Sequence, residues 1–195
     1  MNLPNKLTVL RIILIPFVMF FYLASFIPHG IGKILALVIF IIAALTDLLD
    51  GKIARKYNLV TNLGKFLDPI ADKILTSSVL FMIIADGTIP APWGVIVVSI
   101  IIAREFMVSA LRLLAASKGT VLAADIWGKA KTMVQMIAIP VCMLIPFVIE
   151  IGAVSGLVLT IKIVGWSLLG VATVLTVVSG ANYLIKNKDC FKENK

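Results

Sequence analysis

The stretch DLLDGKIARKYNLVTNLGKFLDPIADKI, residues 47–74, decides how the rest of the chain can be arranged. It contains four aspartates, Asp47, Asp50, Asp68 and Asp72, although the whole chain of 195 residues has only ten acidic residues. Two very apolar segments meet here at a basic loop. Carboxylates at the edge of apolar segments are energetically costly, so they usually have a function. The stretch therefore predicts a functional site held at one depth of a membrane.

Composition excludes an ordinary soluble domain. The chain is 61% hydrophobic and only 14% charged, with a mean hydropathy of +1.09, whereas about a quarter of the residues in a soluble domain are charged. Apolar runs of about 18 residues or more are typical of membrane-spanning helices. We therefore predict an all-α, polytopic membrane protein in which residues 1–195 form a single integral membrane domain.

Six apolar segments are expected to span the membrane. Five of them cover about residues 7–27, 31–57, 93–115, 126–149 and 154–185. The third segment along the chain begins at the end of an expected turn at residues 58–62 and runs to about residue 85. An even number of spans places both termini on one side, and all but two of the 18 Lys and Arg residues fall on that side; the exceptions are Lys33 and Lys162. Basic loops face the cytoplasm, so we predict a cell-membrane protein with both termini and all four aspartates at the cytoplasmic face.

The net charge of +8 could also suggest nucleic-acid binding. However, the basic residues cluster at the ends of apolar segments, which is the pattern of membrane topology. We therefore expect membrane lipid, and no nucleic acid, as a partner.

The spacing of the aspartates favours a metal site. Asp47 and Asp50 are three residues apart, and Asp68 and Asp72 are four apart, so each pair shares one face of a helix. A five-residue turn makes the two helices antiparallel neighbours, which lets the pairs converge. Clustered carboxylates repel one another unless hard cations such as Mg²⁺, Mn²⁺ or Ca²⁺ lie between them. Two such ions could stabilise the attacking and leaving oxygens of a phosphoryl transfer.

A purely structural interpretation explains only part of this pattern. A carboxylate near a helix N-terminus is stabilised by the helix dipole, which would account for Asp68. Asp47 and Asp50 lie near a helix C-terminus, where the dipole disfavours them. Small residues, Gly51, Ala54 and Gly64, would clear a groove beside the ions. Arg55 offers a forked donor for phosphate.

The pattern resembles the signature of the CDP-alcohol phosphotransferases. The family motif is D-x-x-D-G-x-x-A-R followed by G-x-x-x-D-x-x-x-D, and every fixed position has its counterpart here: Asp47, Asp50, Gly51, Ala54, Arg55, Gly64, Asp68 and Asp72. The stretches PNKLTVLR near the N-terminus, AREF at 103–106 and GKAKT at 128–132 are similar to family members that use sn-glycerol 3-phosphate.

The resemblance implies a specific reaction and a set of roles. The phosphatidyl group of CDP-diacylglycerol would pass to sn-glycerol 3-phosphate with release of CMP, in a homodimer that uses Mg²⁺ or Mn²⁺, two ions per site. Asp47, Asp50 and Asp68 would bind the ions, and Asp72 would be both ligand and general base. The residues implied for the CDP site are Asp50, Gly51, Ala54, Arg55 and Gly64, with Asn5 and Thr8 as accessory positions. Helix capping explains Asn5 equally well.

A phosphorylated acceptor also needs cations. Arg104 and Lys131 are the first candidates, because each lies within or beside an apolar run on the cytoplasmic side; Arg112, Lys129 and Arg11 are the others. The alternative is that these side chains reach out to lipid headgroups, and for Arg11 interfacial anchoring is an equal alternative. Glu105 is expected to pair with a neighbouring cation.

Two other functions stay open at this point. A relative using another alcohol, as in cardiolipin, phosphatidylserine or phosphatidylinositol-phosphate synthesis, would carry the same motif, although serine would not need the basic residues. A divalent-cation transporter would also cluster acids. Transporter sites usually lie near the bilayer midplane between structural repeats, whereas these acids lie at one face and the sequence shows no repeat.

Overall fold

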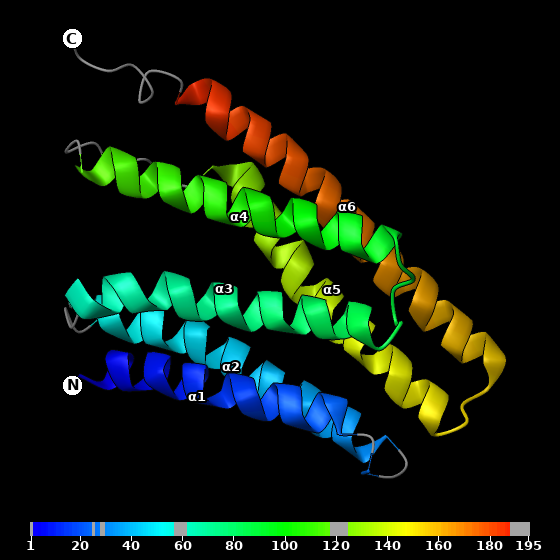
Figure 1. Ribbon diagram of the computed structural model, residues 1–195. Helices are drawn as coiled ribbons and strands as arrows, with labels where there is room; N and C mark the ends of the chain where they lie inside the picture. The colour runs from blue at the N-terminus through cyan, green and yellow to red at the C-terminus, as the bar shows by residue number, and fades with distance from the viewer. Residues whose placement is uncertain (1, 25, 28–29, 57–61, 118–124, 188–195) are drawn as a thin grey trace.

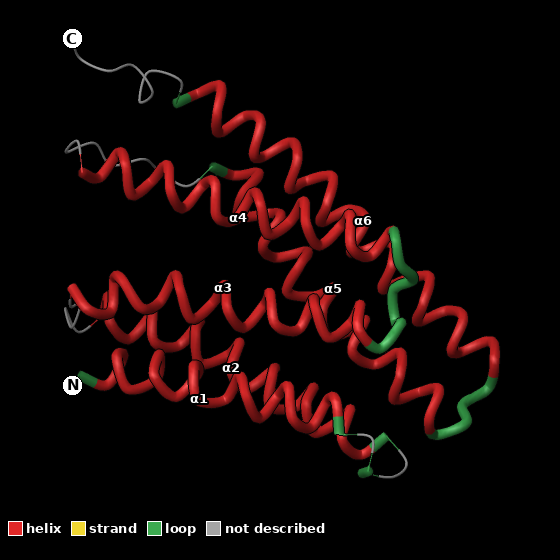
Figure 2. The backbone as a smooth tube through the Cα atoms, in the orientation of Figure 1, coloured by secondary structure: helices red, strands yellow, loops and turns green. Residues whose placement is uncertain are grey.

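The chain folds as a bundle of helices in the computed structural model shown in Figure 1. The structure describes all residues except 1, 25, 28–29, 57–61, 118–124 and 188–195; side chains are additionally left undescribed at 3–4, 48–56, 62–63, 65–66 and 117. Within the described part there are six helices and no strands (Figure 2): α1 (Leu3–Leu23), α2 (Ile31–Lys56), α3 (Asn62–Ala85), α4 (Trp93–Ser117), α5 (Ile126–Glu150) and α6 (Ser155–Lys186). The predicted all-α class is confirmed.

The helix bounds agree closely with the segments expected from hydropathy, except in α1. This helix begins and ends about four residues earlier than predicted. Pro4 lies in its first turn, where the missing N–H of proline costs nothing because no carbonyl precedes it in the helix. The helix ends at Leu23, and the backbone N–H of Ala24 donates to the carbonyl of Phe20.

The helices pack in two groups that are joined by α5 and by a contact between α3 and α4. Helix α1 lies against α2 and α3, α4 lies against α6, and α5 contacts α6, α2 and α3. Large apolar side chains fill the contact between these helices: Tyr22 of α1, Phe40 of α2, Leu80 of α3 and Ile139 of α5 are each at most 1% exposed. Burial of such side chains stabilises the bundle by about 1.5–3 kcal/mol each relative to water.

The direction of the helices alternates along the chain (Figure 1). As a result the starts of α1, α3 and α5 and the ends of α2, α4 and α6 lie at one end of the bundle. The motif aspartates and the basic residues of α4 and α5 belong to this end. We call it the aspartate end.

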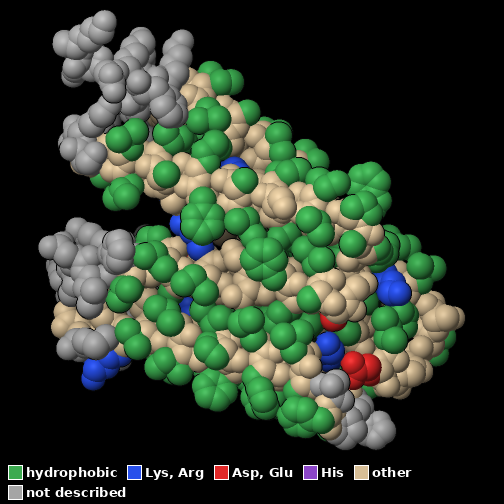
Figure 3. All heavy atoms as spheres, in the orientation of Figure 1, with side chains coloured by type: hydrophobic (Ala, Val, Ile, Leu, Met, Phe, Trp, Pro, Cys, Tyr) green, Lys and Arg blue, Asp and Glu red, His purple; other side chains and the backbone are tan. Residues whose placement is uncertain are grey.

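The face of the bundle seen in Figure 3 carries many hydrophobic side chains and few charged ones. Exposed side chains include Phe81, Trp93, Phe106 and Val174. Four helical stretches among the described residues are long and apolar enough to cross a membrane: Asn5–Leu23, Trp93–Ala116, Ile126–Glu150 and Ser155–Lys186. The chain is therefore a membrane protein with at least these four candidate spans.

Candidate active site

Helix α1 holds two of the motif aspartates in place. The guanidinium of Arg11 lies 2.7 Å from a carboxylate oxygen of Asp47 on α2. The hydroxyl of Thr8 donates a hydrogen bond of 2.5 Å to the carboxylate of Asp68 on α3. Thr8 and Arg11 are three residues apart, so they share the face of α1 that meets both helices, and both are 0% exposed. These two contacts with α1 thus fix the orientation of each carboxylate.

Three of the four aspartates lie at the aspartate end, close enough to influence one another electrostatically. Asp47 interacts electrostatically with Asp68, and Asp72 interacts electrostatically with Asp47. Asp68 and Asp72 lie one turn apart on α3. These oxygen donors suit a hard divalent ion. Within the described side chains no group of three acidic, His or Cys residues meets the geometry of a complete metal site, so the four-aspartate ligand set stays a prediction.

The predicted CDP-site residues are only partly described. Gly64 is buried in α3, and Asn5 is 5% exposed inside α1. Because α1 starts at Leu3 with Asn2 at its N-cap position, Asn5 lies within the helix and is not its cap. The side-chain surroundings predicted for four residues lie outside the described part: Asp50, Gly51, Ala54 and Arg55.

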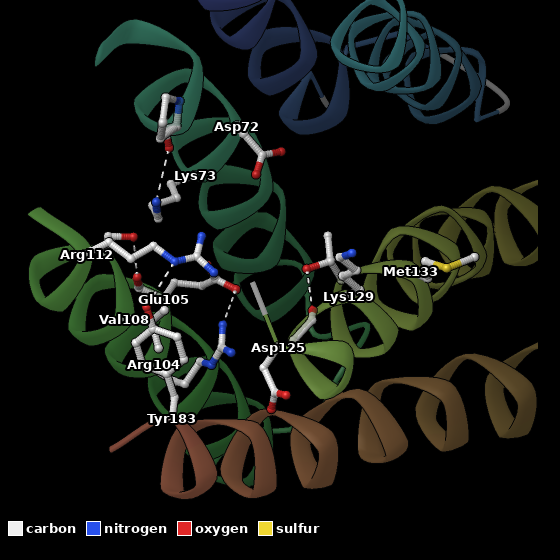
Figure 4. Close-up of a pocket in the computed structure, with 14 residues that line it drawn as sticks. Asp72, Lys73, Arg104, Glu105, Val108, Arg112, Asp125, Lys129, Met133 and Tyr183 are labelled. Carbon is white, nitrogen blue, oxygen red and sulfur yellow. Dashed lines mark hydrogen bonds and ion pairs between the residues drawn. The ribbon is translucent and has the colours of Figure 1, made fainter. Parts of the chain in front are cut away.

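A cavity of about 450 Å³ opens at the aspartate end between α3, α4, α5 and the last turn of α6 (Figure 4). Asp72 of α3 lies on one side of it. Charged side chains dominate the polar lining: Asp72, Lys73, Arg104, Glu105, Arg112, Asp125 and Lys129. Three of the five predicted acceptor-site cations, Arg104, Arg112 and Lys129, therefore surround one space together with the predicted base.

The other two predicted cations lie elsewhere. Arg11 contacts Asp47 and is not among the residues that line the cavity. Lys131 lies directly behind the cavity wall, 1% exposed, and its ammonium donates to the carboxylate of Glu105. The expected pairing of Glu105 is thereby confirmed, and the guanidinium of Arg104 lies 3.7 Å from the same carboxylate. A buried lysine with an acidic partner does not reach out to lipid headgroups.

Two glycines make room for Arg104. A Cβ atom at Gly128 of α5 would lie 3.2 Å from the guanidinium of Arg104, and a Cβ atom at Gly180 of α6 would lie 3.1 Å from its Cγ. The Nε of Arg104 is buried and has no hydrogen-bond partner among the described residues. Arg104 therefore occupies a slot between α5 and α6 with donor capacity to spare for a ligand.

We expect Gly128→Ala to weaken binding of an anionic ligand in the cavity. The added methyl group approaches the Arg104 guanidinium more closely than most real contacts allow, and a displaced guanidinium loses part of a charge-assisted hydrogen bond, which corresponds to about 3- to 10-fold in KM for the acceptor. The matched control is Gly170→Ala, because a Cβ there meets nothing within 4 Å. An unchanged KM in Gly128→Ala would show that Arg104 does not contact the acceptor.

Tyr183 was not predicted from the sequence but orients a cavity residue. Its hydroxyl accepts a hydrogen bond of 3.3 Å from Nε of Arg112, whose guanidinium lies 5.7 Å from the ring centroid. Tyr183 is 2% exposed and packs with Val108 and Leu111 of α4. A tyrosine at the end of an apolar helix normally indicates the membrane interface, so no sequence signal distinguished this one.

Asp125 ties the start of α5 to the end of α6. It occupies the N-cap position of α5, but its side chain makes no capping hydrogen bond. Its carboxylate instead accepts from the amide of Asn182 at 2.9 Å and pairs with Lys186 at 3.4 Å. These contacts close the cavity on the α6 side.

We expect Arg11→Met to destabilise the protein. The pair with Asp47 is fully buried on the arginine side, while the aspartate side chain is 33% exposed. The loss should therefore lie between the about 1 kcal/mol of a surface pair and the about 3–5 kcal/mol of a broken buried pair. Thermal unfolding in detergent measures it, and the double variant with Asp47→Asn should recover part of the loss. An unchanged melting temperature in Arg11→Met would contradict the structural role of this pair.

Comparison with known proteins agrees with the motif. The model of the CDP-alcohol phosphatidyltransferase family matches residues 1–180. The chain belongs to this family. A Bacillus subtilis (strain 168) protein is 44% identical over 206 residues, covering 98% of this chain and 97% of its own. A Rickettsia felis protein is 37% identical, with 97% of both chains covered. A Haemophilus influenzae protein is 41% identical over 140 residues, 71% of this chain and 73% of its own. Each of the three is named CDP-diacylglycerol–glycerol-3-phosphate 3-phosphatidyltransferase.

Proposed function

We propose that this chain transfers the phosphatidyl group of CDP-diacylglycerol to sn-glycerol 3-phosphate, giving phosphatidylglycerol phosphate and CMP in phospholipid biosynthesis. The family and the names of its relatives support the reaction. The observation that carries the choice of acceptor is the cavity in which Asp72 shares one space with Arg104, Arg112 and Lys129. An acceptor that bears its own phosphate needs these cations in addition to the base, whereas serine or another unphosphorylated alcohol needs only the base.

Different cavity residues bind the two ends of the acceptor. The phosphate of the acceptor is bound by Arg104, Arg112 and Lys129, with Lys131 available behind Glu105. The reactive hydroxyl then faces Asp72, which takes its proton as the oxygen attacks phosphorus. Because the acceptor oxygen attacks directly, the reaction needs no covalent intermediate on the protein.

The donor is bound beside the motif aspartates. Asp47, Asp50, Asp68 and Asp72 would hold two Mg²⁺ or Mn²⁺ ions, which would neutralise the pyrophosphate and stabilise CMP as it leaves. Thr8 and Arg11 keep the carboxylates of Asp68 and Asp47 in a fixed orientation. The cytidine side would be lined by Gly51, Ala54, Arg55 and Gly64, with Asn5 as a buried neighbour on α1.

All six helices are proposed to span the cell membrane, with the aspartate end in the cytoplasm. Helices α2 and α3 have 26 and 24 residues, which at 1.5 Å per residue corresponds to roughly 39 and 36 Å, more than the hydrocarbon core of about 30 Å. Their alternating directions and the basic residues of the aspartate end support this orientation. The homodimer implied by the family resemblance is also part of the proposal.

An acceptor panel tests the proposed function. Purified protein in detergent receives CDP-diacylglycerol, Mg²⁺ or Mn²⁺ and one acceptor at a time, and CMP release is measured. We expect release with glycerol 3-phosphate and none with serine, inositol phosphate or phosphatidylglycerol, and we expect a chelator to abolish it. Release with another acceptor would refute the assignment of the basic cavity while keeping the family chemistry. No release with any acceptor would refute the proposed function, and metal flux in vesicles would then test a transporter.

A further inference from the structure

A buried amide lies one helical turn beyond Lys131 on α5. Gln135 is 4% exposed, and its side-chain carbonyl oxygen is buried without a hydrogen-bond partner among the described residues. A buried acceptor without a partner is costly, so such groups are rare unless a ligand satisfies them. The function derived so far assigns no role to this residue.

Gln135 is not among the residues that line the acceptor cavity, but it lies one helical turn from two residues at the cavity. Thr132, three residues earlier on α5, lines the cavity, and Lys131, four residues earlier, lies just behind its wall. Residues three and four apart lie on the same helix face, one above the other. The next residues on the buried face of α5 are apolar: Ala138, Ile139 and Cys142. Gln135 is therefore the innermost polar group on this face near the cavity.

We propose that the carbonyl oxygen of Gln135 accepts a hydrogen bond from the secondary hydroxyl of glycerol 3-phosphate. This inference rests on the proposed function. With the phosphate at Arg104 and Arg112 and the attacking primary hydroxyl at Asp72, the secondary hydroxyl lies between them on the substrate chain. This hydroxyl is the one polar group of glycerol 3-phosphate without an assigned partner. The carbonyl oxygen of Gln135 can accept the hydrogen bond that this hydroxyl can donate. Gln135 thus selects a glycerol phosphate over other phosphorylated alcohols.

The test compares two acceptors in two proteins. The second acceptor is 3-hydroxypropyl phosphate, which has the same phosphate and primary hydroxyl but lacks the secondary hydroxyl. For the wild type we expect kcat/KM to favour glycerol 3-phosphate by roughly 10- to 100-fold, since a buried acceptor left without its donor disfavours the analogue. In Gln135→Leu we expect this preference to disappear because kcat/KM falls with glycerol 3-phosphate and stays unchanged with the analogue.

Controls separate this role from a structural one. Because the carbonyl has no hydrogen-bond partner among the described residues, Gln135→Leu should not lower the melting temperature. Cys142→Ala, on the same buried face, should lower the melting temperature without changing the preference, because it removes packed atoms far from the cavity. Gln135→Glu keeps an acceptor at the same place and should keep the preference.

Several results would overturn the inference. An equal loss with both acceptors in Gln135→Leu would show that Gln135 acts through Lys131 or the fold. An unchanged preference would remove it from the site, and failure of both Gln135→Leu and Gln135→Met to fold would show that its amide bonds within the protein. A wild type that uses both acceptors equally refutes this inference alone, whereas a wild type that uses neither refutes the proposed function.

Discussion

Replacing Asp72 with asparagine is expected to reduce turnover by about 10²–10⁴-fold, the range that a positioned general base contributes, while most CDP-diacylglycerol binding remains. Asp72 lines the cavity together with the cations proposed for the acceptor. Asparagine keeps the size and a coordinating oxygen but cannot take a proton. The loss should therefore appear in kcat, measured by CMP release with saturating glycerol 3-phosphate.

The controls for Asp72 separate proton transfer from metal binding. Asp86→Asn changes an aspartate at the opposite end of α3, where Asp86 pairs with Lys33 at 3.4 Å, and it should leave turnover unchanged. If excess Mn²⁺ restored turnover to Asp72→Asn, Asp72 would be a metal ligand alone. Full activity of Asp72→Asn without added metal would remove it from both roles.

The sequence predicted the parts of the fold and site that follow from local spacing. Helix periodicity places Asp68 and Asp72 on one face, and the short connection expected between the second and third helices places Asp47 at the same end of the bundle. Both follow from residues close together in the chain. Hydropathy predicted the helix bounds because long apolar runs have few alternatives in a membrane. The pairing of Glu105 with a neighbouring cation was also predicted from the sequence.

Contacts between distant segments were beyond sequence reasoning. Arg11 looked equally suited to the acceptor pocket and to the membrane interface, because the sequence does not show which face of α1 meets α2. The hydrogen bond from Thr8 to Asp68 spans 60 residues, and that from Arg112 to Tyr183 spans 71. Gln135 gave no signal either, since one amide in an apolar helix has many structural explanations. Such features depend on how the helices pack, which spacing within one segment does not determine.

Lys131→Met is expected to raise the KM for glycerol 3-phosphate by about 10- to 100-fold, the value of a hydrogen bond to a charged group, with little change in CDP-diacylglycerol binding. In the free protein the ammonium of Lys131 bonds to Glu105, which itself lines the cavity and lies near Arg104. The phosphate of the proposed acceptor would compete with this carboxylate for both cations. Methionine preserves the length of the side chain and the packing of α5, but it removes the charge.

The second partner of the pair makes the prediction specific. Glu105→Gln frees Lys131 and Arg104 from their carboxylate, so the KM for glycerol 3-phosphate should fall or stay constant where Lys131→Met raises it. Lys162→Met removes a lysine of α6 that lines a second cavity at the opposite end of the bundle. This variant should not alter the binding of either substrate. Equal losses of binding for both substrates in Lys131→Met would indicate general misfolding. If Glu105→Gln raised KM as strongly as Lys131→Met, the pair would act as a structural unit, because competition between carboxylate and phosphate predicts that removing the carboxylate does not raise KM.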